Sequence, residues 1–88
     1  MADEKRRKKI LKGGKTEISV MHSGMRQKFE FNIIREETPV GKVPVLKVDR
    51  WINVSELLRI AESLDLPVEG PAGRFFPKGK KAIDYAGM

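Results

Sequence analysis

The chain has 88 residues, 34% of them charged, with a formal net charge of +6 and no cysteine. This length predicts one domain, and the lack of cysteine excludes disulfide frameworks, cysteine-ligated zinc and thiol catalysis. No apolar run is long enough to span a bilayer, and no secretory signal is present, so we expect a cytoplasmic protein that does not bind membranes.

The positive charge is concentrated in two short segments. Residues 1–12 contain six bases and two acids, and residues 74–81 contain four bases and no acid. The 61 residues between them contain eight bases and nine acids. The sequence therefore predicts a nearly neutral domain flanked by two basic segments.

The first 14 residues are expected to form a basic flexible tail. They are poor in large apolar side chains, and their basic side chains repel one another. The remaining residues, 15–88, are expected to form a single α+β domain. Alternating apolar and polar residues predict strands at about 15–22, 27–35 and 43–49. Short connections between them favour a three-stranded antiparallel meander. A turn is expected at His22–Gly24.

A helix is predicted at about 54–64, where apolar residues recur at helical spacing. Asn53 is a suitable N-cap, and Glu56, three residues later, is its expected capping-box partner. Together the strands and the helix predict a small two-layer sandwich, with Trp51 filling the edge between the layers.

The C-terminal quarter of the chain is rich in proline and glycine. Three prolines and three glycines in residues 66–79 predict a loop without regular structure. A short C-terminal helix or strand is possible over residues 82–86.

No residue pattern predicts catalysis, a cofactor or a metal site, although an enzyme is not excluded. His22 and Ser23 are neighbours without an obvious orienting carboxylate, and a second histidine is lacking. Glu36 and Glu37 are expected to be solvated.

The leading functional hypothesis is weak, largely sequence-independent nucleic-acid binding, with RNA or single strands favoured. Basic side chains would neutralise phosphates, and a phenylalanine would stack on a base. The candidate binding residues are Lys5, Arg6, Arg7, Lys8, Lys9, Arg74, Phe75, Phe76, Lys78, Lys80 and Lys81. The competing interpretation of Phe75 and Phe76 is that both rings close the core.

The alternative hypothesis is a protein-interaction module or small subunit without catalytic activity. Proline cannot donate a backbone hydrogen bond, so Pro44 predicts that the third strand either is an edge strand, which includes residues 44–46, or begins just after Pro44. Such an edge could pair with a second copy or with another protein.

The order of a basic N-terminal segment, three strands and a helix resembles the double-stranded-RNA-binding domain. That resemblance is confined to element order. Residues 53–56 lack the lysine cluster with which that family grips phosphates, so the chain is assigned to no family.

Overall fold

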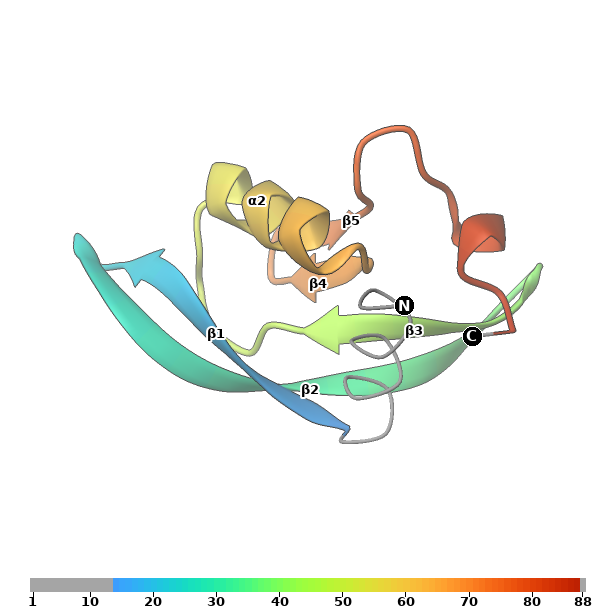
Figure 1. Cartoon of the computed structure of the whole chain (residues 1–88), viewed down its shortest axis with the longest axis horizontal. Helices are drawn as coiled ribbons and strands as arrows, with labels where there is room; N and C mark the ends of the chain where they lie inside the picture. The colour runs from blue at the N-terminus through green and yellow to red at the C-terminus, as the bar shows by residue number, and fades with distance from the viewer. Residues whose placement is uncertain (1–13, 88) are drawn as a thin grey trace, which may run out of the picture.

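The computed structural model describes residues 14–87, which form five strands, one α-helix and one 3-10 turn. The strands are β1 (Lys15–His22), β2 (Met25–Thr38), β3 (Gly41–Lys47), β4 (Val68–Gly70) and β5 (Gly73–Phe75). Helix α2 spans Val54–Leu64, and the 3-10 turn η1 spans Ala82–Asp84. The expected α+β class is confirmed (Figure 1). The expected flexible tail, residues 1–14, lies outside the described residues except for Gly14.

The strands form one mixed sheet in the order β1-β2-β3-β4-β5. β1, β2 and β3 pair antiparallel, and β4 pairs parallel with β3 because α2 carries the chain back across the sheet. β5 then pairs antiparallel with β4. The sheet therefore has two strands more than the predicted meander.

Both additional strands come from the proline- and glycine-rich stretch that was expected to be a loop. The breakers lie at the ends of these strands: Pro67 precedes β4, the β4–β5 turn contains Pro71, and Pro77 follows β5. The two short strands between them align Val68 with Phe75. The breaker residues thus delimit the second hairpin and leave its strands intact.

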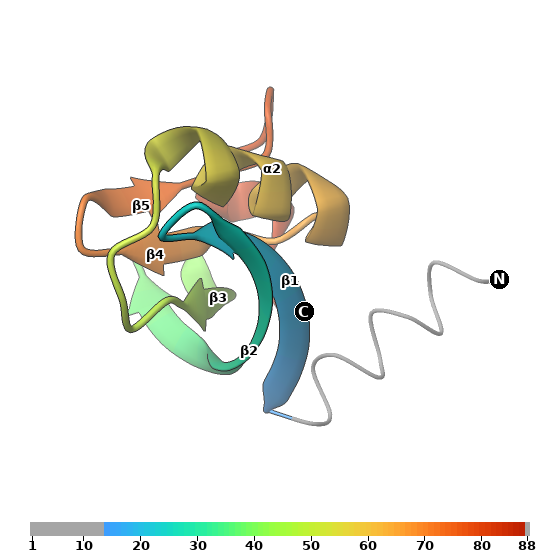
Figure 2. The ribbon, with the colours of Figure 1, turned by 90° about the vertical axis from the view of Figure 1, so that its left-hand side faces the viewer.

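The β1–β2 hairpin closes at the expected turn. Ser23 and Gly24 both have positive φ, 54° and 78°, as a two-residue turn matched to strand twist requires. Beyond it, β2 continues for 14 residues and curves beneath α2 (Figures 1 and 2). This length lets β2 pair with β1 through its first half and with β3 through its second.

Helix α2 has the predicted bounds and covers the main core. Leu57 and Ile60 are fully buried against residues of β1 to β4, including Val20, Phe31 and Leu46. A second cluster joins Val43 and Val45 of β3 to C-terminal side chains that include Tyr85. The C-terminal segment, expected as a short helix or strand, contains a single 3-10 turn.

Two expectations about individual residues are wrong. Trp51 does not fill the edge between the layers but is 66% exposed, because its neighbour Ile52 takes the inward position at 3% exposure. Pro44 and Leu46 do not lie on an open edge. Leu46 pairs with Val68, and the region of β3 before it is covered by C-terminal residues, with Gly87 N donating to Lys42 O.

Candidate nucleic-acid interface

Residues 77–81, which follow β5 and form what we call the lysine loop, have a defined backbone conformation. Pro77 is buried, and its carbonyl accepts the N–H of Lys80 at 2.9 Å. Gly79, with φ 78°, takes the left-handed position that closes this turn. Beyond it, the N–H of Lys81 donates to Asp84 Oδ2 at 2.7 Å. The loop is thus fixed at both ends.

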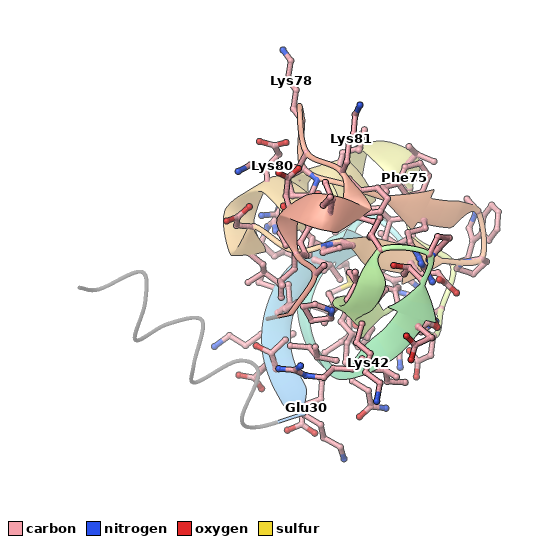
Figure 3. The ribbon with its side chains drawn as sticks, turned by 90° about the vertical axis from the view of Figure 1, so that its right-hand side faces the viewer. Glu30, Lys42, Phe75, Lys78, Lys80 and Lys81 are labelled. Atoms are coloured by element: carbon pink, nitrogen blue, oxygen red, sulfur yellow. The ribbon has the colours of Figure 1, made fainter. Side chains whose placement is uncertain are left out.

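Three lysines of this loop point into solvent. Lys78, Lys80 and Lys81 are all exposed and extend from one end of the domain (Figure 3). Within residues 14–87, none of their ammonium groups takes part in an ion pair. An incoming phosphate would therefore not have to displace a carboxylate of the described chain from these groups.

Two carboxylates lie close to the same loop and limit its charge. Glu62 of α2 accepts the backbone N–H of Lys78, and Asp84 accepts that of Lys81. Both accept backbone N–H groups, and neither forms an ion pair with a lysine of the loop. They still offset part of the local positive field, so the loop alone predicts weak phosphate binding.

Arg74 has a different environment from these lysines. Its guanidinium donates from Nε to Glu69 Oε1 at 2.9 Å and also contacts Glu36. Lys47 Nζ lies 3.0 Å from Glu69 Oε2 and bonds Glu36 as well. The four residues link β2, β3, β4 and β5 in one charge network. Glu36 is thus ion-paired, and the expectation that it is only solvated is wrong.

The charges of this network are mutually stabilised. The bonds from Arg74 and then Lys47 hold the pKa of Glu69 below its ordinary value. The bond to Glu36, opposed by partial burial, raises the pKa of Lys47. A phosphate at Arg74 would compete with two carboxylates already in place.

Phe75 and Phe76 are both partly buried and contact separate apolar clusters. Phe75 packs against the main core beneath α2. Phe76 packs against the Tyr85 cluster, with ring centroids 6.5 Å apart. Their positions agree with the interpretation that both rings close the core.

A second aromatic and basic cluster was not predicted. The guanidinium of Arg50 lies 4.1 Å from the centroid of Phe29 and 5.8 Å from that of Phe31, a cation–π arrangement. His22 meets Phe29 edge-on at 5.4 Å. Arg50 is 21 positions from Phe29, so only the strand pairing brings them together, and no local motif signals it.

His22 and Ser23, the neighbouring pair noted in the sequence, lie where β1 enters its turn to β2. His22 Nδ1 and Ser23 Oγ are 3.5 Å apart, at the outer limit of a hydrogen bond. Among residues 14–87, no three histidine or acidic side chains cluster in a way that could hold a metal ion. In the same range, no helix has the length and apolar character needed to cross a bilayer.

The other predicted phosphate-binding residues, Lys5, Arg6, Arg7, Lys8 and Lys9, lie outside the described residues. The fold therefore defines a small α+β domain with a mixed five-stranded sheet and one exposed lysine loop. No protein-family model, curated protein or solved structure matches the chain.

Proposed function

We propose that this protein binds nucleic acid weakly and largely without sequence readout, with RNA or single strands favoured. The phosphate contacts are made by Lys78, Lys80 and Lys81, together with the N-terminal bases Lys5 to Lys9. The observation that carries the proposal is the fixed loop whose three ammonium groups are exposed and unpaired within residues 14–87. Such groups release counterions from a phosphate backbone without a preceding cost of breaking ion pairs.

The mode of binding follows from what surrounds the loop. Helix α2 has one basic residue, Arg59, which is paired with Glu56, and the exposed Glu62 adds negative charge, so this helix is poorly suited to a DNA groove. Phe75 and Phe76 are committed to the core clusters, so base stacking on these rings is not part of the proposal. Binding through lysines alone reads charge, which is why we expect little sequence preference.

Salt-dependent binding of a fluorescent single-stranded RNA to the full chain, followed by anisotropy, tests this proposal. The triple variant K78Q/K80Q/K81Q removes the loop charges, and K28Q/R35Q/K42Q is the matched control with the same charge change. We expect the loop variant to lower the slope of log affinity against log salt by up to about 2, at about 0.7 per contact. The control should lower it much less.

Two results would overturn the proposal. One is no detectable binding at ~50 mM salt, where phosphate contacts are strongest. The other is equal loss of affinity in both triple variants, which would reduce the loop to part of the overall net charge.

A second candidate function, protein interaction through an edge strand, is favoured by a separate observation. β1 is the terminal strand of the sheet and has no strand beside its outer edge among the described residues. Unpaired backbone groups on such an edge accept an added strand.

A further inference from the structure

The outer edge of β1 presents backbone groups at alternate residues. Gly14 O accepts the N–H of Ile33, so even-numbered residues of β1 direct their backbone groups toward β2. Odd-numbered residues consequently direct theirs outward. The carbonyl of Ser19 and the N–H of Met21 confirm this, because both bond side chains of α2.

Helix α2 closes one half of this edge and leaves the other half open. Arg59 Nη2 donates to Ser19 O at 2.8 Å, and Glu56 Oε2 accepts the N–H of Met21 at 2.9 Å. The Lys15 end of β1 is the end of this strand that is remote from α2 (Figure 1). There, the outward backbone groups of Lys15 and Glu17 have no hydrogen-bond partner within residues 14–87.

The side chains beside the open half carry an unfavourable charge pair. Glu17 lies directly opposite Glu30 of β2, and Lys15 lies opposite Asn32. Glu17 and Glu30 are both exposed, and no cation within residues 14–87 forms an ion pair with either. Figure 3 shows Glu30 at the opposite end of the domain from the lysine loop. Like charges placed directly across a sheet destabilise it.

We propose that the open half of β1 pairs antiparallel with β1 of a second copy of this chain, centred on Thr16. In this register, Lys15 of each copy faces Glu17 of the other, and the two Thr16 residues face each other. Each Glu17 then lies between Glu30 of its own chain and Lys15 of the second copy. The incoming lysine offsets the like-charge pair, and the two sheets join into one.

The neighbouring registers are less favourable because they bring like charges together or break contacts between β1 and α2. Outward residues must face outward residues, so the pairing can shift only in steps that keep this match. One step places Lys15 against Lys15, and the opposite step places Glu17 against Glu17. Registers further along require Ser19 and Met21 to leave Arg59 and Glu56. Charge therefore selects the proposed register.

This inference rests on the second candidate function and is independent of RNA binding. The interface consists of two hydrogen-bonded residue pairs, which exchange four backbone hydrogen bonds, and a short strip of side chains. An interface of this size predicts weak, concentration-dependent association, which is expected at high micromolar protein and lost on dilution.

Sedimentation equilibrium of the full chain from about 10 µM to about 1 mM tests the proposal. K15E and E17K should each weaken self-association by about tenfold or more, and K15E/E17K should restore it. K28E, an exposed charge reversal on β2, is the matched control and should leave association unchanged. E17K places a lysine against Glu30 within the monomer, so it should remain folded by circular dichroism.

Two outcomes would overturn the dimer. One is a monomer at every concentration, and the other is a double variant that associates no better than the single variants. RNA anisotropy at about 1 µM protein, where the chain is monomeric, tests the RNA proposal separately. Retained RNA binding without self-association would reject the dimer alone.

Discussion

The carboxylate of Glu56 accepts the backbone N–H of Met21, 35 positions earlier in the chain, at 2.9 Å. Glu56 also bonds Arg59, whose Nη2 lies 2.7 Å from Glu56 Oε2. The capping box expected from Asn53 and Glu56 is therefore wrong: the Asn53 side chain makes no capping bond. The acid expected to cap its own helix instead ties α2 to the edge of β1.

Glu56→Gln should lower the free energy of unfolding by about 1–2 kcal/mol, because a charge-assisted bond is lost at a side chain only 11% exposed. Hydrogen bonding to Arg59 holds the pKa of Glu56 below its ordinary value. Its folded pKa thus lies below its unfolded pKa of about 4.3, so its stabilisation is complete above that pH and declines as pH falls through the folded pKa. Urea unfolding at pH 7 and pH 3 should show a smaller gap between variant and parent at pH 3.

Asn53→Ala is the matched control for this prediction. An N-cap whose side chain bonds the helix costs about 1 kcal/mol when truncated, whereas Asn53 makes no such bond. We expect a loss below about 0.5 kcal/mol. A loss at Asn53 larger than that at Glu56 would restore the capping box and contradict the observed contact.

Local periodicity predicted the elements in which apolar residues recur at a regular spacing. The bounds of β1 and α2 are those expected, because Ile18 and Val20 alternate with polar residues and Leu57, Ile60 and Ala61 share one helical face. β4 and β5 were missed because each has only three residues. A strand that short carries too few alternations to outweigh the flanking prolines and glycines.

Long-range pairing explains what the sequence could not show about the site. The lysine loop was found from composition, since its charges are adjacent in the chain. Arg74 lies 38 positions from Glu36, and only the five-strand order brings their side chains into contact. Two basic residues only four positions apart therefore have different roles, Lys78 in an exposed loop and Arg74 in a structural ion pair.

Lys47→Met should destabilise the fold by about 1 kcal/mol at pH 7, because Glu36 and Glu69 lose one of the two cations that they share, Arg74 being the other. The lowered pKa of Glu69 sets the sign of the pH dependence. Its contribution is present above about pH 4.3 and is lost as pH falls, so the difference between variant and parent should shrink in acid. Thermal unfolding from pH 7 to pH 3 measures this.

Lys28→Met provides the comparison for Lys47, since Lys28 is exposed and forms no ion pair within residues 14–87. Its stability should stay within about 0.5 kcal/mol of the parent at every pH. Equal losses for the two variants at pH 7 would show that the network adds nothing beyond net charge.

Trp51→Ser should change the free energy of unfolding by less than about 0.5 kcal/mol, because this ring is 66% exposed. Ile52→Ala, one position later at 3% exposure, should cost about 2–4 kcal/mol. Trp51 is the one tryptophan of the chain, so acrylamide quenching of its fluorescence reports its exposure directly. Poor quenching together with a large loss in Trp51→Ser would place the ring in the core instead.

Phe75→Leu and Phe76→Leu should each lower stability by about 1 kcal/mol or more and leave RNA affinity unchanged at temperatures where the variants stay folded. The reason is that both rings pack within the domain, Phe75 against the main core and Phe76 against Tyr85. Denaturant unfolding and RNA anisotropy on the same samples separate the two effects. If Phe75→Leu weakened RNA binding several-fold with stability intact, that ring would be a stacking platform and lysine contacts alone would not account for binding.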